Sequence, residues 1–115
     1  MIPKPDRHQD MRDALRALCA QFPAEYHRKH DQDVTYPVEF IDALTSAGWL
    51  AAMIPEEFGG SGLGLTEATV VMEEINRSGG NAGHCHGQMY NMSTLLRHGS
   101  KAQKDFYLPR IASGD

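Results

Sequence analysis

Apolar side chains recur at the three- and four-residue spacing of an α-helix along most of this sequence. In residues 6–22 they fall at i, i+4, i+7 and i+11, which predicts an amphipathic helix with Asp6 as its N-cap. Its inner positions are Met11, Leu15, Leu18 and Phe22. Pro23 should end this helix, and the strongly charged run Ala24–Asp33 predicts a solvated helical turn after it.

A second helix is predicted from Pro37, which suits a first helical position, to Gly48, which suits a left-handed C-cap. Its inner face is Val38, Ile41, Leu44 and Thr45. The apolar run Trp49–Ile54 is too short for another helix after a glycine cap, so we expect an extended, buried connector. A turn that begins at Pro55 and a glycine-rich loop then lead into the next helix.

The helix after the glycine loop is expected to begin at a Thr66 N-cap and to bury one apolar stripe. That stripe consists of Ala68, Val71, Met72 and Ile75. Glu73 and Glu74 are adjacent, so their side chains point about 100° apart and cannot share a proton as a catalytic pair. We therefore expect both carboxylates on a solvated face, with Glu73 paired to Arg77 one turn later.

The stretch Ser78–Leu96 contains no Asp, Glu, Lys or Arg, although charged residues make up 23% of the chain. A glycine-rich turn should lead into a buried helix from about His84 to Arg97. One stripe of this helix is apolar and contains Cys85, Met89, Met92 and Leu96. A second, mostly polar stripe contains His84, Gln88, Asn91 and Leu95. If that second face is buried, its polar groups need hydrogen bonds, water or a ligand.

A final helix is predicted from a capping box in which Ser100 and Gln103 stand three residues apart. Pro109 removes one backbone hydrogen bond inside this helix and should kink it. Its inner face is Tyr107, Leu108, Ile111 and Ala112. The sequence thus predicts an all-α, orthogonal bundle of about five or six helices. We expect one domain over residues 1–115, with residues 1–5 as a frayed arm.

Composition and charge narrow the functional classes. The net charge of −4 gives no reason to expect binding to nucleic acid or to an anionic membrane surface. We find no signal peptide and no apolar run long enough for a membrane span. Cys19 and Cys85 lie in helical patterns rather than in a disulfide framework, which indicates free thiols and a cytoplasmic location.

Three candidate sites are rejected on residue spacing and geometry. The glycine loop matches two positions of the dinucleotide-binding fingerprint, but Leu65 stands where its third glycine is required. Glu67 would also place a negative charge where a phosphate should dock. The run His84–His86 lacks further spaced ligands for zinc, and Cys85 lacks the third group that orients a nucleophile–base pair. We therefore predict no catalytic and no metal-binding residue here.

Three stretches together resemble the N-terminal helical domain of the acyl-CoA dehydrogenases. They are GWLAAMIPEEFGGSGLG (residues 48–64), TEATVVMEEINRSGG (residues 66–80) and LLRHGSKAQKDFYLPRIASGD (residues 95–115). Each stretch is moderately specific, and their common order and spacing favour the family. The resemblance extends from about Pro37 to the end of the sequence, and more loosely through the first helix.

This resemblance implies a FAD enzyme that oxidises the α,β bond of an acyl-CoA thioester to the trans-2-enoyl product. In the family, a carboxylate takes the α proton while the flavin takes the β hydride. Such enzymes add a flavin-binding β-barrel and a C-terminal helical bundle to this domain, and they are homodimers or homotetramers. The flavin motif, most CoA contacts and the catalytic Glu would lie beyond Asp115. We therefore expect residues 1–115 alone to bind no flavin and to be inactive.

In the family, the helix that matches His84–Arg97 lines the cavity for the acyl chain. The wall residues that the resemblance implies here are Gln88, Asn91, Met92 and Leu95, with His84 beside them. The alternative is ordinary core for the two apolar residues and hydrogen-bonded buried groups for the three polar ones. Two alternatives for the whole chain also stand: a stand-alone helical module for binding or assembly, and the same domain of an acyl-CoA oxidase or flavin monooxygenase.

Overall fold

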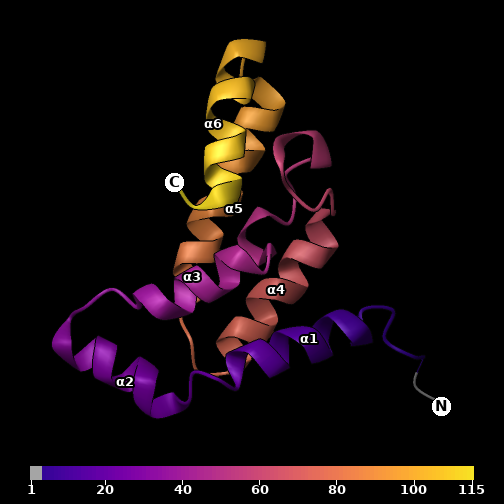
Figure 1. The fold of residues 1–115 in the computed structure, drawn as a ribbon. Helices are drawn as coiled ribbons and strands as arrows, with labels where there is room; N and C mark the ends of the chain where they lie inside the picture. Colours follow the sequence, from indigo (N-terminus) through magenta and orange to yellow (C-terminus); the bar gives the residue numbers. More distant parts are fainter. Residues whose placement is uncertain (1–3) are drawn as a thin grey trace.

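The structure is a computed structural model that describes residues 4–115, so most of the arm expected at residues 1–5 lies outside the described residues. Every regular element within them is helical (Figure 1). The α-helices are α1 (Gln9–Cys19), α2 (Ala24–Asp33), α3 (Val38–Ser46), α4 (Leu65–Arg77), α5 (Gly83–His98) and α6 (Lys101–Ser113). Two short 3₁₀ turns are η1 (Trp49–Ala51) and η2 (Glu56–Phe58). The all-α fold predicted from the sequence is confirmed.

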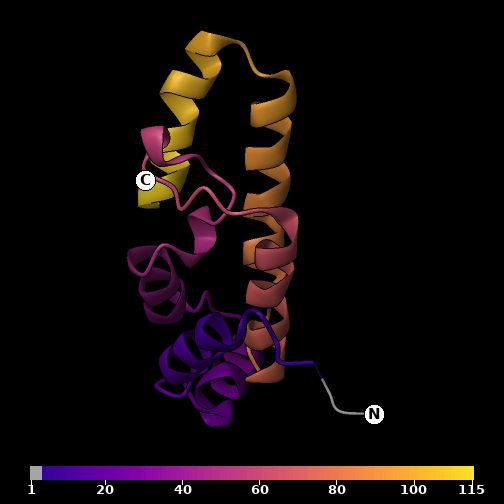
Figure 2. The same cartoon turned by 90° about the vertical axis from the view of Figure 1, so that its right-hand side faces the viewer.

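The helices form two layers, with α4 and α5 in one and α1, α3 and α6 in the other (Figure 2). The molecule measures 46 × 42 × 19 Å, and its short dimension is about two helix diameters of ~10 Å. Its radius of gyration of 15.0 Å exceeds the ~13 Å of a compact domain of this length. Because the molecule is so thin, a helix in either layer keeps part of its surface uncovered.

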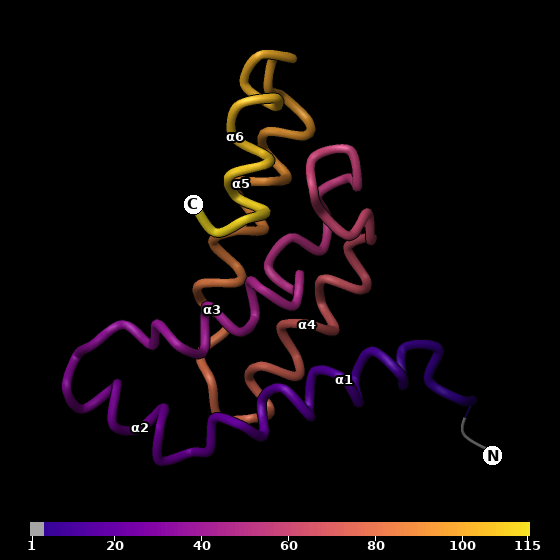
Figure 3. The backbone as a smooth tube through the Cα atoms, viewed as in Figure 1, coloured from indigo at the N-terminus to yellow at the C-terminus, as the bar shows by residue number. Residues whose placement is uncertain are grey.

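Two groups of buried side chains hold the layers together. The larger group joins α1, α3, α4 and the first half of α5, and its largest members are Leu15, Phe40, Leu44, Val71 and Ile75. The smaller group joins the connector after α3, the second half of α5, and α6 through Ala51, Ile54, Met92 and Leu108. Helix α5 contributes to both groups, and α6 folds back along its second half (Figure 3).

Most of the predicted inner positions face these groups, but two do not. Val38 is 50% exposed because it is the first residue of α3, where no other element lies over it. Tyr107 is 48% exposed because α6 is covered only along the side that carries Leu108 and Ile111. Each predicted stripe was therefore too wide at one position.

Glu74 is buried, contrary to the prediction that it lies on a solvated face. Its side chain is 2% exposed and accepts hydrogen bonds from Arg12 Nη1 at 2.9 Å and from Arg16 Nε at 2.8 Å. Both arginines belong to α1, which packs against α4. The pattern of a single helix carries no information about cations on another helix. Among residues 4–115, Glu73 pairs with Arg12 at 2.7 Å rather than with the expected Arg77.

The connector after α3 is buried as predicted, but it is not extended. Residues 49–51 form η1, and the Ile54 N–H donates to the carbonyl of Ala51 at 3.1 Å. These turns bury Leu50–Ala52 and Ile54 together, whereas an extended strand would point alternate side chains outward. The glycine loop then packs closely against this segment, since a Cβ on Gly60 would lie 2.0 Å from the carbonyl oxygen of Ile54.

The helix starts at α4 and α6 illustrate one wrong and one correct prediction. Helix α4 begins one residue before Thr66, with Gly64 as its N-cap. The Gly64 N–H donates to Glu67 Oε2 at 3.1 Å, so the first turn is capped by a carboxylate inside the helix. At α6 the predicted capping box is confirmed: the Gln103 N–H donates to Ser100 Oγ at 3.2 Å, and the Ser100 N–H donates to Gln103 Oε1 at 2.9 Å.

Candidate ligand groove along α5

Helix α5 begins after a turn that two asparagine side chains fix. Asn76 Oδ1 accepts the N–H of Ala82 at 3.2 Å, and Asn81 Oδ1 accepts the N–H of Gly83 at 2.8 Å. The helix then runs without a charged residue as far as Arg97. Its apolar stripe packs inward as predicted, with Cys85, Met89 and Met92 buried.

The polar stripe of α5 is not buried, which corrects the prediction of a fully buried helix. His84 and Gln88 are half-buried and Asn91 is exposed. These residues lie on the side of α5 that faces α3 and the end of α6 without being covered by them. The stripe therefore borders open space, and its side chains are accessible to a ligand.

A groove of about 710 Å³ lies between α5, α3 and the C-terminal end of α6, and we name it the α5 groove. Its α5 wall consists of Gly83, His84, Gly87, Gln88 and Asn91. Its other walls consist of Tyr36, Ile41, Asp42, Thr45, Ser46, Leu50, Ile111 and residues 113–115. At one end the ring of Tyr36 meets the edge of His84, with 4.6 Å between the ring centroids.

Three of the five wall residues expected from the sequence meet in this groove. His84, Gln88 and Asn91 line it together. Met92 is 1% exposed and packs in the smaller core group, and Leu95 is half-buried beside that group. Neither of them lines the α5 groove as it stands here.

Sequence reasoning missed the α3 wall of the groove. Asp42, Thr45 and Ser46 line it from α3; Thr45 was predicted only as part of the inner face of this helix, and none of the three was predicted to belong to a site. It also missed the role of Gly87, where a Cβ would have no other atom within 4 Å. The periodicity of the sequence showed that these α3 residues lie on a helix, but nothing in the sequence showed that α5 would lie opposite them.

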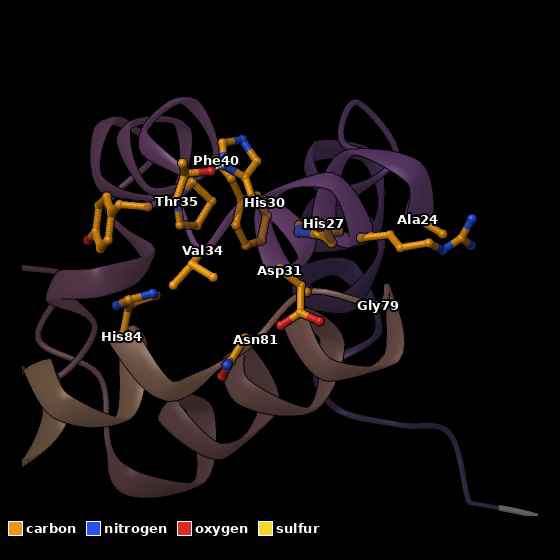
Figure 4. Close-up of a pocket in the computed structure, with 14 residues that line it drawn as sticks. Ala24, His27, His30, Asp31, Val34, Thr35, Phe40, Gly79, Asn81 and His84 are labelled. Carbon is orange, nitrogen blue, oxygen red and sulfur yellow. Dashed lines mark hydrogen bonds between the residues drawn. The ribbon is translucent and has the colours of Figure 1, made fainter.

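A second cavity of about 670 Å³ lies between α2 and the start of α5 (Figure 4). Val34 and Asn81 face it from opposite sides, and His84 borders both cavities. The imidazole of His27 packs against the ring of Phe40 at 4.8 Å, and its Nε2 is buried without a hydrogen-bond partner among the described residues. Burial lowers the pKa of His27, so this ring is neutral at pH 7.

The second cavity is bordered by a helix with no fully buried residue. Helix α2 contacts the core only through partly buried side chains such as Tyr26. Val34, the residue after it, has φ 54° and ψ 45°, a left-handed conformation that β-branched residues rarely adopt. Its side chain is 91% exposed. Since α3, α5 and α6 each bury side chains beside the α5 groove, we regard that groove as the better candidate site.

The two cysteines do not have the environment of a reactive thiol. Burial raises the pKa of Cys85 to about 12, and burial also raises the pKa of Cys19. Both thiols therefore stay protonated at neutral pH and behave as small apolar side chains. This agrees with the rejection of Cys85 as a nucleophile on sequence grounds.

The glycine loop is unsuited to a nucleotide phosphate. Glu67 accepts the Gly64 N–H at the start of α4, where a phosphate would need free amides and no negative charge. The α5 groove is lined by no Lys or Arg among residues 4–115 that could meet a pyrophosphate. Neither the glycine loop nor the α5 groove therefore fits the phosphates of FAD. In the same range, no helix is long and apolar enough to cross a membrane, and no cluster of three His, Cys, Asp or Glu is placed to hold a metal ion.

The fold and the groove together define the class of this protein. It is an open helical domain in which the α5 groove is uncovered on one side. The family model described as "Acyl-CoA dehydrogenase, N-terminal domain" matches residues 5–115. The chain therefore belongs to the acyl-CoA dehydrogenase family, and these residues are its N-terminal domain. The resemblance stated from the sequence is confirmed.

Named relatives agree with this family. Isovaleryl-CoA dehydrogenase of Pongo abelii is 37% identical over 109 residues, which cover 88% of this chain and 26% of the relative. The probable acyl-CoA dehydrogenase FadE25 of Mycobacterium tuberculosis is 34% identical over 111 residues, which cover 95% of this chain and 28% of the relative. The chain thus spans about a quarter of the length of these relatives.

Proposed function

We propose that this chain is the substrate-side domain of a FAD-dependent acyl-CoA dehydrogenase that desaturates the α,β bond of an acyl-CoA thioester. The observation that carries the proposal is the α5 groove, in which the uncharged part of α5 presents His84, Gln88 and Asn91 beside the apolar Ile111. A concave site with a few placed polar groups is the usual form of a small-molecule site. The family match over residues 5–115 supplies the reaction class.

The roles within the proposed site are non-covalent. Gln88 and Asn91 would bind and orient the acyl part of the substrate, and His84 would close one end of the groove together with Tyr36. Met92 and Leu95 would support this wall from behind, through the core group they share with α6. FAD supplies hydride acceptance when bound, and we assign its contacts and the catalytic carboxylate to the β-barrel and C-terminal domains of the full-length protein.

The test is made on the full-length protein that contains this domain. Purified protein should carry FAD, and its flavin absorbance should bleach when an acyl-CoA substrate is added anaerobically. Formation of the trans-2-enoyl thioester would then be followed with an artificial electron acceptor. Absence of both bleaching and product over straight, branched and substituted acyl-CoA thioesters would reject the proposal in favour of a binding or assembly module.

A second experiment concerns residues 1–115 in isolation. We propose that they bind no flavin and turn over no acyl-CoA; the glycine loop and the α5 groove, neither of which fits the phosphates of FAD, support this proposal. A stoichiometric flavin spectrum from this segment would contradict that proposal. Hydrogen peroxide production under air by the full-length protein would indicate an acyl-CoA oxidase instead of a dehydrogenase.

Location and assembly are further proposals. We propose a cytoplasmic homo-oligomer, on the basis of the two unpaired thiols and the family resemblance. The relative from Pongo abelii is a mitochondrial protein, so fractionation of the source cells is the direct test of location. Sedimentation of the full-length protein is the test of assembly.

A further inference from the structure

Three polar side chains of the α5 groove make no hydrogen bond to the rest of the domain. They are Gln88 and Asn91 on α5 and Thr45 on α3, and none of them bonds through its side chain to any of residues 4–115. Asn91 is exposed and the other two are half-buried, so two amides and a hydroxyl face open space with their donors and acceptors free for water or a bound molecule.

The charge of the groove restricts what that molecule can carry. No Lys or Arg lines the groove among the described residues, while the carboxylate of Asp42 does. Asp42 and Asp115 are both exposed, and a carboxylate brought beside them would meet like charge without a compensating cation, which is unfavourable. The groove therefore suits an uncharged ligand group better than an anionic one.

The lining of the groove is more polar than apolar, and it leaves room beside the helix. Ile41 and Ile111 supply aliphatic surface, and Gly87 leaves the α5 backbone open, with no atom within 4 Å of where its Cβ would be. A carbon skeleton can lie on this aliphatic surface while a substituent reaches the amides of Gln88 and Asn91. Such a lining differs from the continuous apolar wall that a plain alkyl chain would require.

We propose that the acyl group of the substrate carries an uncharged hydrogen-bonding substituent, a hydroxyl or a carbonyl, which Gln88 and Asn91 bind in the α5 groove. Acyl groups that end in a carboxylate are disfavoured by the like charge of Asp42. This inference rests on the proposed function, because it assigns the acyl part of an acyl-CoA to this groove.

The test compares three acyl-CoA thioesters of equal carbon number with the full-length, FAD-loaded protein. One is unsubstituted, one carries a hydroxyl group distal to the thioester, and one ends in a carboxylate. We expect kcat/KM for the hydroxylated thioester to exceed that for the unsubstituted one about tenfold, the value of one good hydrogen bond. The carboxylate thioester should be the poorest of the three.

Two groove variants and a control sharpen the comparison. Gln88→Leu should remove the preference for the hydroxylated thioester, whereas Gln32→Leu on the exposed side of α2 should preserve it. Asn91→Arg introduces the missing cation and should raise kcat/KM for the carboxylate thioester about tenfold. A gain of this kind cannot arise from a misfolded protein.

Binding gives a readout that does not depend on turnover. Unreactive analogues, in which a methylene replaces the thioester carbonyl, should show the same order of Kd by calorimetry. An active enzyme that prefers the unsubstituted thioester, or that is unaffected by Gln88→Leu, would overturn the inference and leave the proposed function standing. Failure to bind or oxidise any acyl-CoA would overturn both.

Discussion

Glu74 links the two layers, because its carboxylate on α4 pairs with two arginines on α1. Hydrogen bonds from Arg16, and then from Arg12, lower the pKa of Glu74 to about 2. The carboxylate is therefore charged at all ordinary pH values although it is 2% exposed. A buried charge is tolerated only when it is paired and hydrogen-bonded, and α1 supplies both partners.

Replacing this carboxylate should cost more stability than replacing its neighbour. Glu74→Gln leaves the guanidinium groups of Arg12 and Arg16 without their shared anion. We expect the free energy of unfolding to fall by about 2–3 kcal/mol, below the ~3–5 kcal/mol of fully enclosed pairs, because Arg16 is 41% exposed. The matched control Glu73→Gln, at a site 58% exposed, should change it by less than about 0.5 kcal/mol. Urea unfolding measures both values, and equal losses would contradict the assignment.

The same carboxylate should make stability depend on acid pH. Its pKa is lowered in the folded state, from 4.5 to about 2, so the unfolded chain binds the proton more readily. The stabilisation is therefore complete above about pH 4.5 and is lost as the pH falls toward 2. Unfolding free energies at pH 6, 4 and 3 should decline more steeply for the wild type than for Glu74→Gln. Parallel profiles would show that other groups dominate acid unfolding.

At the scale of elements, the sequence predicted which segments are helices better than where they begin. Periodicity identified the segments that form α1, α3, α4, α5 and α6, because each buries one apolar stripe. Caps were less predictable: α1 begins after His8 rather than Asp6, and Pro37 precedes α3 instead of starting it. Cap choice depends on the direction from which the chain enters, which neighbouring elements decide.

The α5 groove shows more clearly that the pattern of one helix does not reveal its neighbouring elements. The polar stripe of α5 could be recognised from the sequence, but its partner wall on α3 could not. Only the packing of α3 and α6 against α5 brings Thr45 and Ile111 to face Gln88. A stripe of polar residues indicates that one side of a helix differs from the other. Whether that side meets water or a ligand is decided by tertiary packing.

Helix α2 offers a test of local strain. Val34 ends it in a left-handed conformation that costs a β-branched residue about 1 kcal/mol or more, whereas asparagine adopts it readily. Val34→Asn should therefore raise the free energy of unfolding by about 1 kcal/mol. Val38→Asn, at a residue 50% exposed with helical geometry, should give no such gain. Amide exchange of α2 should slow in the first variant only; equal behaviour would show that Val34 is not strained in solution.

At the scale of the whole molecule, the thin double layer leaves large apolar side chains uncovered. Tyr90, Phe106 and Tyr107 on α5 and α6 are 64%, 50% and 48% exposed. From the family resemblance we expect an apolar surface on the outer side of the last helices, where the other domains of the family pack. These three residues are consistent with such a contact, since exposed aromatic groups often mark interaction surfaces.

This exposure leads to a prediction about residues 1–115 in isolation. They should bind an apolar-surface dye such as ANS and self-associate weakly, whereas the full-length protein should do neither at the same concentration. The double variant Phe106→Ser with Tyr107→Ser should reduce the dye signal of the isolated segment. A monodisperse monomer without dye binding would show that these side chains are not a contact surface.

The link between Glu74 and α1 also orders events during synthesis. Its two arginine partners precede it by 58 and 62 residues, so α1 leaves the ribosome long before the carboxylate that holds it exists. At elongation rates of roughly 5–20 residues per second, the wait is roughly 3–12 s. During that interval α1 is a nascent amphipathic segment whose two arginines lack their shared carboxylate and whose apolar stripe is uncovered. The first helix to be made is thus among the last to be fixed in place.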